Sequence, residues 1–153
     1  MKTYFLKLDE NAVIPEYQTE KSSGFDLVVS KDIYIEAGDT QLVETGLAVI
    51  LPVDTELQVR PRGSTSLNGP LRIANTPGTV DEDYLNKEVK IICWNVGKIP
   101  LLIKRGDRIA QGVICPVIRT DNLEVDETEY NQLAEFRRTS RDGGFGSTGD
   151  TSG

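Results

Sequence analysis

The stretch Asn75–Tyr84 reads Asn-Thr-Pro-Gly-Thr-Val-Asp-Glu-Asp-Tyr, and the rest of the chain is organised around it. Pro77-Gly78 predicts a turn, because proline fixes φ and glycine tolerates positive φ. The residues that follow predict an extended run, whose side chains alternate between two faces. We expect residues 79–95 to form a β-hairpin with its tip near residues 86 and 87.

The three consecutive acids Asp81, Glu82 and Asp83 have two interpretations. They can be the acidic corner of a hairpin in water, which is the usual fate of such a run. Alternatively, one carboxylate activates a water molecule while the ring of Tyr84 packs against a ligand. The stretch alone favours the first interpretation, and only the remainder of the chain can favour the second.

Composition narrows the class of protein. The chain has 153 residues, with 38% hydrophobic and 27% charged residues, as expected of one globular domain with a real core. Its formal charge of −7 argues against a broad nucleic-acid-binding face. We find no signal peptide and no apolar run of bilayer length, and therefore expect no membrane partner and a cytoplasmic location, or a nuclear one by diffusion.

The sequence contains no histidine. Serine and cysteine catalysis that depends on an imidazole, and zinc held by histidine, are therefore excluded. If the chain is an enzyme, its general base is expected to be a carboxylate. Cys93 and Cys115 lie in apolar runs and are expected to be buried free thiols.

Predicted strands recur about every 8–12 residues with turns between them, which is typical of an all-β sandwich or barrel. The one candidate helix covers residues 127–136. After residue 136 the composition becomes rich in glycine and serine. We therefore expect a β domain over residues 1–136 and a flexible C-terminal arm over residues 137–153.

Several polar segments flank the predicted strands. Asp26 stands at the mouth of one strand, and the segment 61–66 combines arginine, glycine and hydroxyls, which together can bind an anion. Gln111 lies inside an apolar run, and Phe145 lies between glycines, four residues after Arg141. Each feature alone is an ordinary turn, loop or tail, although a flexible arm with an aromatic ring and a guanidinium could close over a base and a phosphate.

Taken together, these segments resemble the trimeric deoxyuridine triphosphatases (dUTPases) over nearly the whole chain. Five motifs carry the resemblance, in the order in which the family has them. They are Gly24–Leu27, Pro61–Ser64, Gly78–Tyr84 with Asn75 just ahead, Arg105–Gln111 and Gly143–Gly149.

The resemblance implies a jelly-roll-like β fold and a homotrimer with three active sites at the subunit junctions. One chain would supply the first, second and fourth motifs, a second chain the third, and the fifth would arrive as an arm. The implied reaction is hydrolysis of dUTP to dUMP and pyrophosphate with Mg2+, which keeps uracil out of DNA and supplies dUMP for thymidylate synthesis.

The resemblance also implies roles for single residues. Asp81 is the expected general base, and Asp26 is expected to orient water around the Mg2+ that the triphosphate coordinates. Tyr84 is expected to pack against the deoxyribose, and Phe145 to stack on uracil. The residues expected to bind substrate are Arg62, Gly63, Ser64, Asn75, Gly78, Val80, Tyr84, Lys90, Gln111, Arg141, Phe145, Gly146, Ser147 and Thr148.

Three departures from the family pattern concern substrate contacts. The second motif has Gly63-Ser64 where the family has serine and then glycine, and the segment 85–88 is one residue longer than in the family. The fifth motif has one glycine fewer after Arg141, which makes Arg138 a candidate to take the place of Arg141. Two other functions stay open: a dCTP deaminase of the same fold, including a form that also cleaves the triphosphate, and a nucleotide-sensing protein that acts through a partner.

Overall fold

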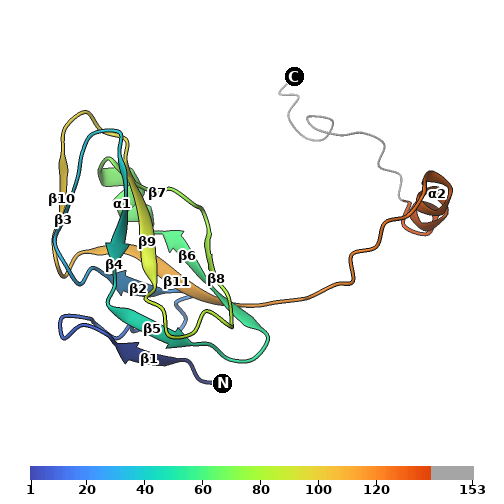
Figure 1. Ribbon diagram of the computed structural model, residues 1–153, viewed down its shortest axis with the longest axis horizontal. Helices are drawn as coiled ribbons and strands as arrows, with labels where there is room; N and C mark the ends of the chain where they lie inside the picture. The colour runs from blue at the N-terminus through green and yellow to red at the C-terminus, as the bar shows by residue number, and fades with distance from the viewer. Residues whose placement is uncertain (139–153) are drawn as a thin grey trace. The chain divides into compact units, whose positions relative to one another are not determined.

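The computed structural model describes residues 1–138, which are mostly β-strands, as predicted (Figure 1). The elements in chain order are β1 (Tyr4–Lys7), β2 (Phe25–Val28), β3 (Ile33–Ile35), β4 (Thr40–Glu44), β5 (Leu47–Ile50), β6 (Thr55–Pro61), α1 (Gly63–Asn68), β7 (Leu71–Ile73), β8 (Gly78–Val80), β9 (Lys90–Asn95), β10 (Leu101–Ile103), β11 (Arg108–Pro116) and α2 (Glu127–Glu135).

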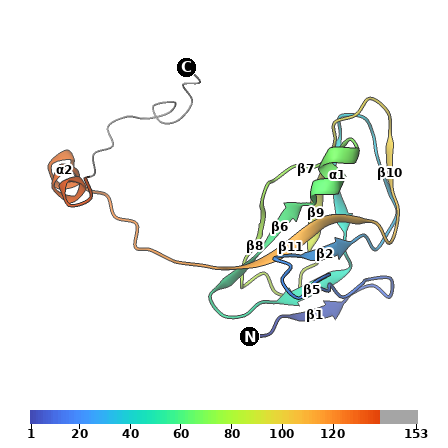
Figure 2. The same ribbon diagram turned by 180° about the vertical axis from the view of Figure 1, so that it is seen from behind.

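The sheet that matters most for function is antiparallel and has the strand order β2-β11-β6-β8 (Figure 2). Strand β6 alternates strictly, because Leu57 and Val59 are buried whereas Gln58 and Arg60 are only half-buried. In the register of this sheet, Gln111 on β11 lies opposite both Asp26 on β2 and Arg60 on β6. The sheet therefore places three polar residues in one row across its strands.

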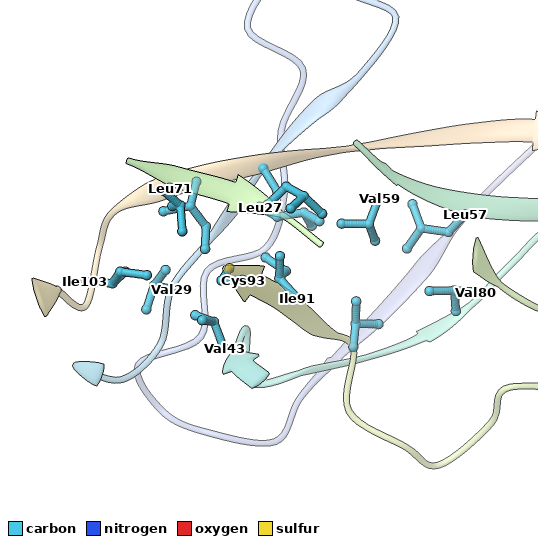
Figure 3. Close-up of a cluster of buried hydrophobic side chains, with 14 of the residues drawn as sticks. Leu27, Val29, Val43, Leu57, Val59, Leu71, Val80, Ile91, Cys93 and Ile103 are labelled. Atoms are coloured by element: carbon cyan, nitrogen blue, oxygen red, sulfur yellow. The ribbon is translucent and has the colours of Figure 1, made fainter. Parts of the chain in front are cut away.

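A second antiparallel sheet has the order β4-β9-β7, and two smaller sheets pair β1 with β5 and β10 with β3. Buried aliphatic side chains from the two larger sheets meet in one core cluster (Figure 3). Leu57, Val59 and Val80 come from the first sheet and Val43 and Ile91 from the second. Their removal from water is the main force that holds the sheets together, at roughly 1.5–3 kcal/mol for each fully buried side chain of this size.

One buried polar residue, Asn95, links neighbouring segments at the edge of this core. Asn95 at the end of β9 is fully buried, and its side-chain amide donates to the carbonyls of Ile35, at 3.0 Å, and Ile99, at 2.8 Å. Its Oδ1 accepts a hydrogen bond from the backbone N–H of Gly97 at 2.9 Å. Asn95 therefore ties β9 to β3 and to the loop before β10, and all its polar atoms are satisfied.

The all-β prediction is confirmed, but two details differ. Residues 79–95 do not form a paired hairpin, because β8 pairs with β6 while β9 pairs with β4 and β7. The turn near the expected tip does exist, and Asn86 there has a φ of 61°. A second short helix, α1, accompanies the expected α2, so the described chain has one helix more than the sequence predicts.

The chain divides into two units, Met1–Ile118 and Arg119–Gly153. In the second unit, α2 begins after Asp126, whose carboxylate accepts a hydrogen bond from Glu129 N at 2.8 Å, and the helix buries no residue. Within residues 1–138, neither helix is long and apolar enough to cross a membrane.

Candidate active site

A hollow of about 530 Å³ lies at the end of β6 and the start of α1. Its lining includes Arg60, Arg62, Gly63, Ser66 and Gln111, and we call it the arginine pocket. Two guanidinium groups, an amide and a hydroxyl on one wall are suited to binding an anion with several oxygens, such as a phosphate chain.

The position of Arg62 is fixed by Asp26. The Arg62 Nε lies 2.9 Å from Asp26 Oδ1, and Arg108 Nη1 lies 3.6 Å from Asp26 Oδ2. Arg62 also donates to the carbonyl oxygen of Arg108 at 2.8 Å. Because one carboxylate faces two guanidinium groups, the cluster keeps a net positive charge beside the pocket. The Asp26 side chain is only 14% exposed, so solvent screens this cluster incompletely.

The side-chain amide of Gln111 is held at the arginine pocket by the backbone of Pro61. Its Nε2 donates to the carbonyl oxygen of Pro61 at 2.9 Å. A Cβ placed on Gly24 would stand 2.6 Å from Gln111 Oε1, closer than nonbonded atoms approach. The glycine of the first motif therefore leaves the space that the Gln111 amide occupies.

A second and smaller hollow, of about 250 Å³, lies between β8, β9 and the segment that joins them. Its lining includes Val59, Asn75, Gly78, Tyr84 and Lys90, and we call it the tyrosine pocket. A Cβ on Gly78 would stand 3.2 Å from both Asn75 Nδ2 and Val59 Cβ, so glycine keeps this pocket open. The pocket offers backbone groups, an amide and an aromatic ring in a space suited to a flat base and a sugar.

Hydrogen bonds within the segment between β8 and β9, and one from Asp54, hold this segment in place. The Tyr84 hydroxyl donates to the carbonyl oxygen of Glu88 at 3.0 Å, and Tyr84 N donates to the carbonyl oxygen of Asp81 at 3.1 Å. Glu82 accepts a hydrogen bond from Asp54 N at 3.0 Å. Of the three consecutive acids, Glu82 is therefore the one with a structural contact. The extended run expected through Asp83 is wrong, because β8 ends at Val80 and residues 82–83 form a turn, so strand alternation does not apply to the three acids.

Asp81 directly follows Val80, a lining residue of the tyrosine pocket. It is exposed, and its side chain makes no hydrogen bond or ion pair with any residue in the range 1–138. The carboxylate is therefore free to accept a proton from a water molecule.

The expected site residues fall into four groups. Arg62, Gly63 and Gln111 line the arginine pocket, with Asp26 joined to it through its ion pair. The tyrosine pocket is lined by Asn75, Gly78, Val80, Tyr84 and Lys90. Two residues, Asp81 and Ser64, line neither pocket. The residues outside the described part of the chain are Arg141, Phe145, Gly146, Ser147 and Thr148.

Six lining residues of the arginine pocket were not among the residues expected to bind substrate: Gln58, Arg60, Pro61, Ser66, Thr76 and Pro77. Arg60 lies on β6, two residues before Arg62, which follows the end of that strand at Pro61. Ser66 lies three residues after Gly63 in α1, and no sequence signal predicted that helix.

The electrostatic surroundings of the tyrosine pocket include one ion-pair cluster. Glu44 Oε2 lies 3.1 Å from Lys31 Nζ, and Glu44 Oε1 lies 3.9 Å from Lys90 Nζ. The hydrogen bond from Lys31 to Glu44 and the charge of Glu44 raise the pKa of Lys31 above its ordinary value. Lys90 brings a basic side chain to the lining of the tyrosine pocket.

The described residues contain no group of three or more histidine, cysteine, aspartate or glutamate side chains that could hold a metal ion. The Asp26 carboxylate already faces Arg62 and Arg108. A single carboxylate shared with two guanidinium groups forms no protein cage for a metal, so a magnesium ion here would have to be held chiefly by the oxygens of a ligand and by water.

The comparisons with known proteins agree with this geometry. The family model described as dUTPase matches residues 10–149. The deoxyuridine 5′-triphosphate nucleotidohydrolase of Gloeothece citriformis is 45% identical over 152 residues, which is 99% of each chain. The corresponding protein of Helicobacter pylori is 43% identical over 149 residues, which is 97% of each chain.

Solved structures share the fold. The dUTPase of Staphylococcus bacteriophage 80alpha with dUPNHPP has a TM-score of 0.81 and 22% identity, and the match covers 97% of this chain and 98% of that one. The D95N mutant dUTPase of phage phi11, in which a structural Mg(II) ion is coordinated, has a TM-score of 0.77 and 22% identity over 84% of this chain and 99% of that one. On this near-complete match of sequence, motifs and fold, the chain belongs to the dUTPase family.

Proposed function

We propose that this chain hydrolyses dUTP to dUMP and pyrophosphate, and that its active site is assembled between protomers. The observation that carries the proposal is the pair of pockets. The arginine pocket suits the triphosphate, and the tyrosine pocket suits the uracil and the deoxyribose. The near full-length relatives that are 43–45% identical carry the name of this activity.

The proposed chemistry needs one base and no histidine. Asp81 takes a proton from water, and the water oxygen forms a bond to the α-phosphorus. The bond from this phosphorus to the oxygen that bridges to the β-phosphorus breaks, and pyrophosphate leaves with that oxygen. Asp81 is suited to the role because its carboxylate makes no hydrogen bond or ion pair within residues 1–138. It also directly follows Val80, which lines the tyrosine pocket.

The phosphate chain is held by the arginine pocket. Arg62 binds it with its guanidinium while Asp26 fixes the direction of that group, and the Gln111 amide donates beside it. When bound, Mg2+ supplies positive charge that neutralises the triphosphate oxygens, with Asp26 holding a water of its shell. The family assignment is consistent with this metal.

The base is read by the tyrosine pocket. Backbone groups of Gly78 and Val80, with the Asn75 amide, pair with the polar edge of uracil, and a cytosine edge leaves these groups unpaired. Tyr84 packs against the deoxyribose and leaves no room for a 2′-hydroxyl. Arg141, Phe145, Gly146, Ser147 and Thr148 are proposed to complete the site from residues outside the described part of the chain.

The assembly between protomers is supported by the fold of one chain. Val59 lines the tyrosine pocket and Arg60 lines the arginine pocket, and these neighbours point to opposite sides of β6. We therefore propose that the two ends of one nucleotide are held by pockets of two different chains. A closed homotrimer in which each arginine pocket meets a neighbour's tyrosine pocket provides this arrangement.

A coupled pyrophosphate assay across dUTP and the four standard deoxynucleoside triphosphates tests the function. We expect turnover of dUTP and at most trace turnover of the other four. Release of ammonia from dCTP would instead identify a deaminase, which none of the relatives named above favours. Binding of dUTP without any release of pyrophosphate would point to a nucleotide-sensing protein.

A further inference from the structure

We infer that Ser66, and not Ser64, supplies the hydroxyl that binds the phosphate chain in the arginine pocket. This inference rests on the proposed function, because it names a contact within the same site. It concerns α1, a helix of six residues that runs from Gly63 to Asn68.

The geometry of α1 separates its hydroxyl-bearing residues. Side chains three residues apart lie on the same face of a helix, so Gly63 and Ser66 share one face. Both line the arginine pocket, whereas Ser64 and Thr65 do not. Ser64 is exposed, whereas Thr65 and Ser66 are both half-buried, so it is the pocket lining that separates Ser66 from Thr65.

The backbone fixes this arrangement next to Arg62. The N–H of Ser66 donates to the carbonyl oxygen of Arg62 at 3.2 Å, which closes the first turn of α1. Asp26 in turn holds the Arg62 guanidinium at 2.9 Å. The Ser66 side chain therefore stands one helical turn from the arginine that we propose to bind phosphate, and the two groups can donate to one anion.

The position of Gly63 offers an independent check of the same face. A Cβ added there would meet no heavy atom within 4 Å, and Gly63 itself lines the pocket. A serine at this position therefore fits without a clash, beside the pocket that Gly63 lines. Positions 63 and 66 are one helical turn apart, and either could place a hydroxyl beside the arginine pocket. This chain has its serine at position 66.

The test measures steady-state dUTP hydrolysis and binding of dUPNHPP by the full chain. Ser66→Ala is expected to weaken dUPNHPP binding about tenfold or more, since a hydrogen bond to a charged group is lost. Binding of deoxyuridine, which has no phosphate, is expected to stay the same. The matched control is Thr65→Ala, which removes a hydroxyl from the same helix but outside the pocket and should leave both affinities unchanged.

A rescue experiment separates a missing hydroxyl from a damaged helix. Gly63→Ser combined with Ser66→Ala is expected to regain most of the dUPNHPP affinity. Gly63→Ala combined with Ser66→Ala, which has the same Cβ without the hydroxyl, is expected to stay weak. Recovery by the alanine version would show that helix stability, rather than a phosphate contact, is at stake.

Three outcomes would overturn the inference while leaving the proposed function intact. One is an unchanged dUPNHPP affinity in Ser66→Ala, and another is an equal loss of deoxyuridine affinity. The third is a larger loss in Ser64→Ala than in Ser66→Ala, which would return the role to Ser64. A wild-type chain that neither binds dUPNHPP nor releases pyrophosphate from dUTP would overturn the proposed function and this inference together.

Discussion

Val59 and Arg60 are neighbours on β6, yet they line different pockets. Val59 is 3% exposed and faces the interior side of the sheet, where the tyrosine pocket lies, whereas Arg60 faces the opposite side and the arginine pocket. Successive side chains of a strand point to opposite faces of its sheet, because the strand period is two residues. The two pockets of one chain therefore draw on opposite faces of β6.

Mixing two inactive variants should restore activity, since each variant damages a different half of the site. Asp81→Asn impairs the half near the tyrosine pocket, and Arg62→Ala impairs the arginine pocket. After unfolding and refolding together in equal amounts, random trimers should recover roughly a quarter of the wild-type pyrophosphate release. A mixture of Asp81→Asn with the double variant Asp81→Asn/Arg62→Ala should stay inactive. Without recovery in the first mixture, the site lies within one chain.

Asp81→Asn alone should abolish pyrophosphate release while keeping dUTP affinity within about threefold, because an amide keeps the size of the side chain but cannot accept the proton of water. Single-turnover assays and calorimetric titration with dUPNHPP measure the two quantities. Glu82→Gln is the matched control: its carboxylate accepts a hydrogen bond from Asp54 N, so we expect turnover to change little. Full turnover in Asp81→Asn would remove Asp81 from its proposed role.

Local patterns predicted the strands well but not their partners. The alternation of Leu57 to Arg60 and the apolar run of β9 indicated strands, and both form. The prediction of a hairpin over residues 79–95 was wrong. Residues 81–89 separate β8 from β9, and the two strands pair in different sheets, β8 with β6 and β9 with β4. Strand pairing over such distances depends on the packing of the whole core, which no local window contains.

The candidate site shows the same limit. The sequence supplied Asp26, Arg62 and Gln111 through the family motifs, and the structure brings all three together. It did not predict α1, because glycine, serine and threonine have weak helix propensity. Without that helix, no pattern in the sequence favours Ser66 over Ser64.

Tyr84→Ala should reduce discrimination against UTP by about tenfold or more, because the ring that packs against the sugar is lost and a 2′-hydroxyl gains space. Tyr84→Phe keeps the ring but loses the hydrogen bond to the Glu88 carbonyl, and should retain most of the discrimination. The measurement is the ratio of kcat/KM for dUTP to that for UTP. An unchanged ratio in Tyr84→Ala would assign sugar selection to other residues.

The buried thiol of Cys93 should make the fold sensitive to alkali. Burial raises the pKa of Cys93 from 9.0 to about 12, so the folded chain keeps a proton that the unfolded chain releases. Stability from this group is therefore fully present below pH 9 and is lost as the pH rises toward 12, with a slope of at most about 1.4 kcal/mol per pH unit.

Chemical denaturation at a series of alkaline pH values measures this slope. Cys93→Ala should be less stable near neutrality but should lose less stability between pH 9 and pH 11. The matched control is Cys115→Ala, since Cys115 is only half-buried. Iodoacetamide should modify Cys93 in the folded protein only through unfolding, and rapid labelling of Cys93 at pH 8 would contradict its burial.

Deletion after Arg138 should cost turnover far more than stability. The deleted residues 139–153 are rich in glycine and serine and include one large apolar side chain, Phe145, so we expect them to add little to the core. The deleted segment contains Arg141 and Phe145, which we propose to act at the nucleotide. We expect turnover to fall by about a hundredfold or more, while the melting temperature shifts by only a few degrees.

Arg141→Ala and Phe145→Ala in the full chain should each reproduce part of the loss of turnover. A large drop in melting temperature upon deletion would instead assign the segment a role in holding the fold or the trimer together.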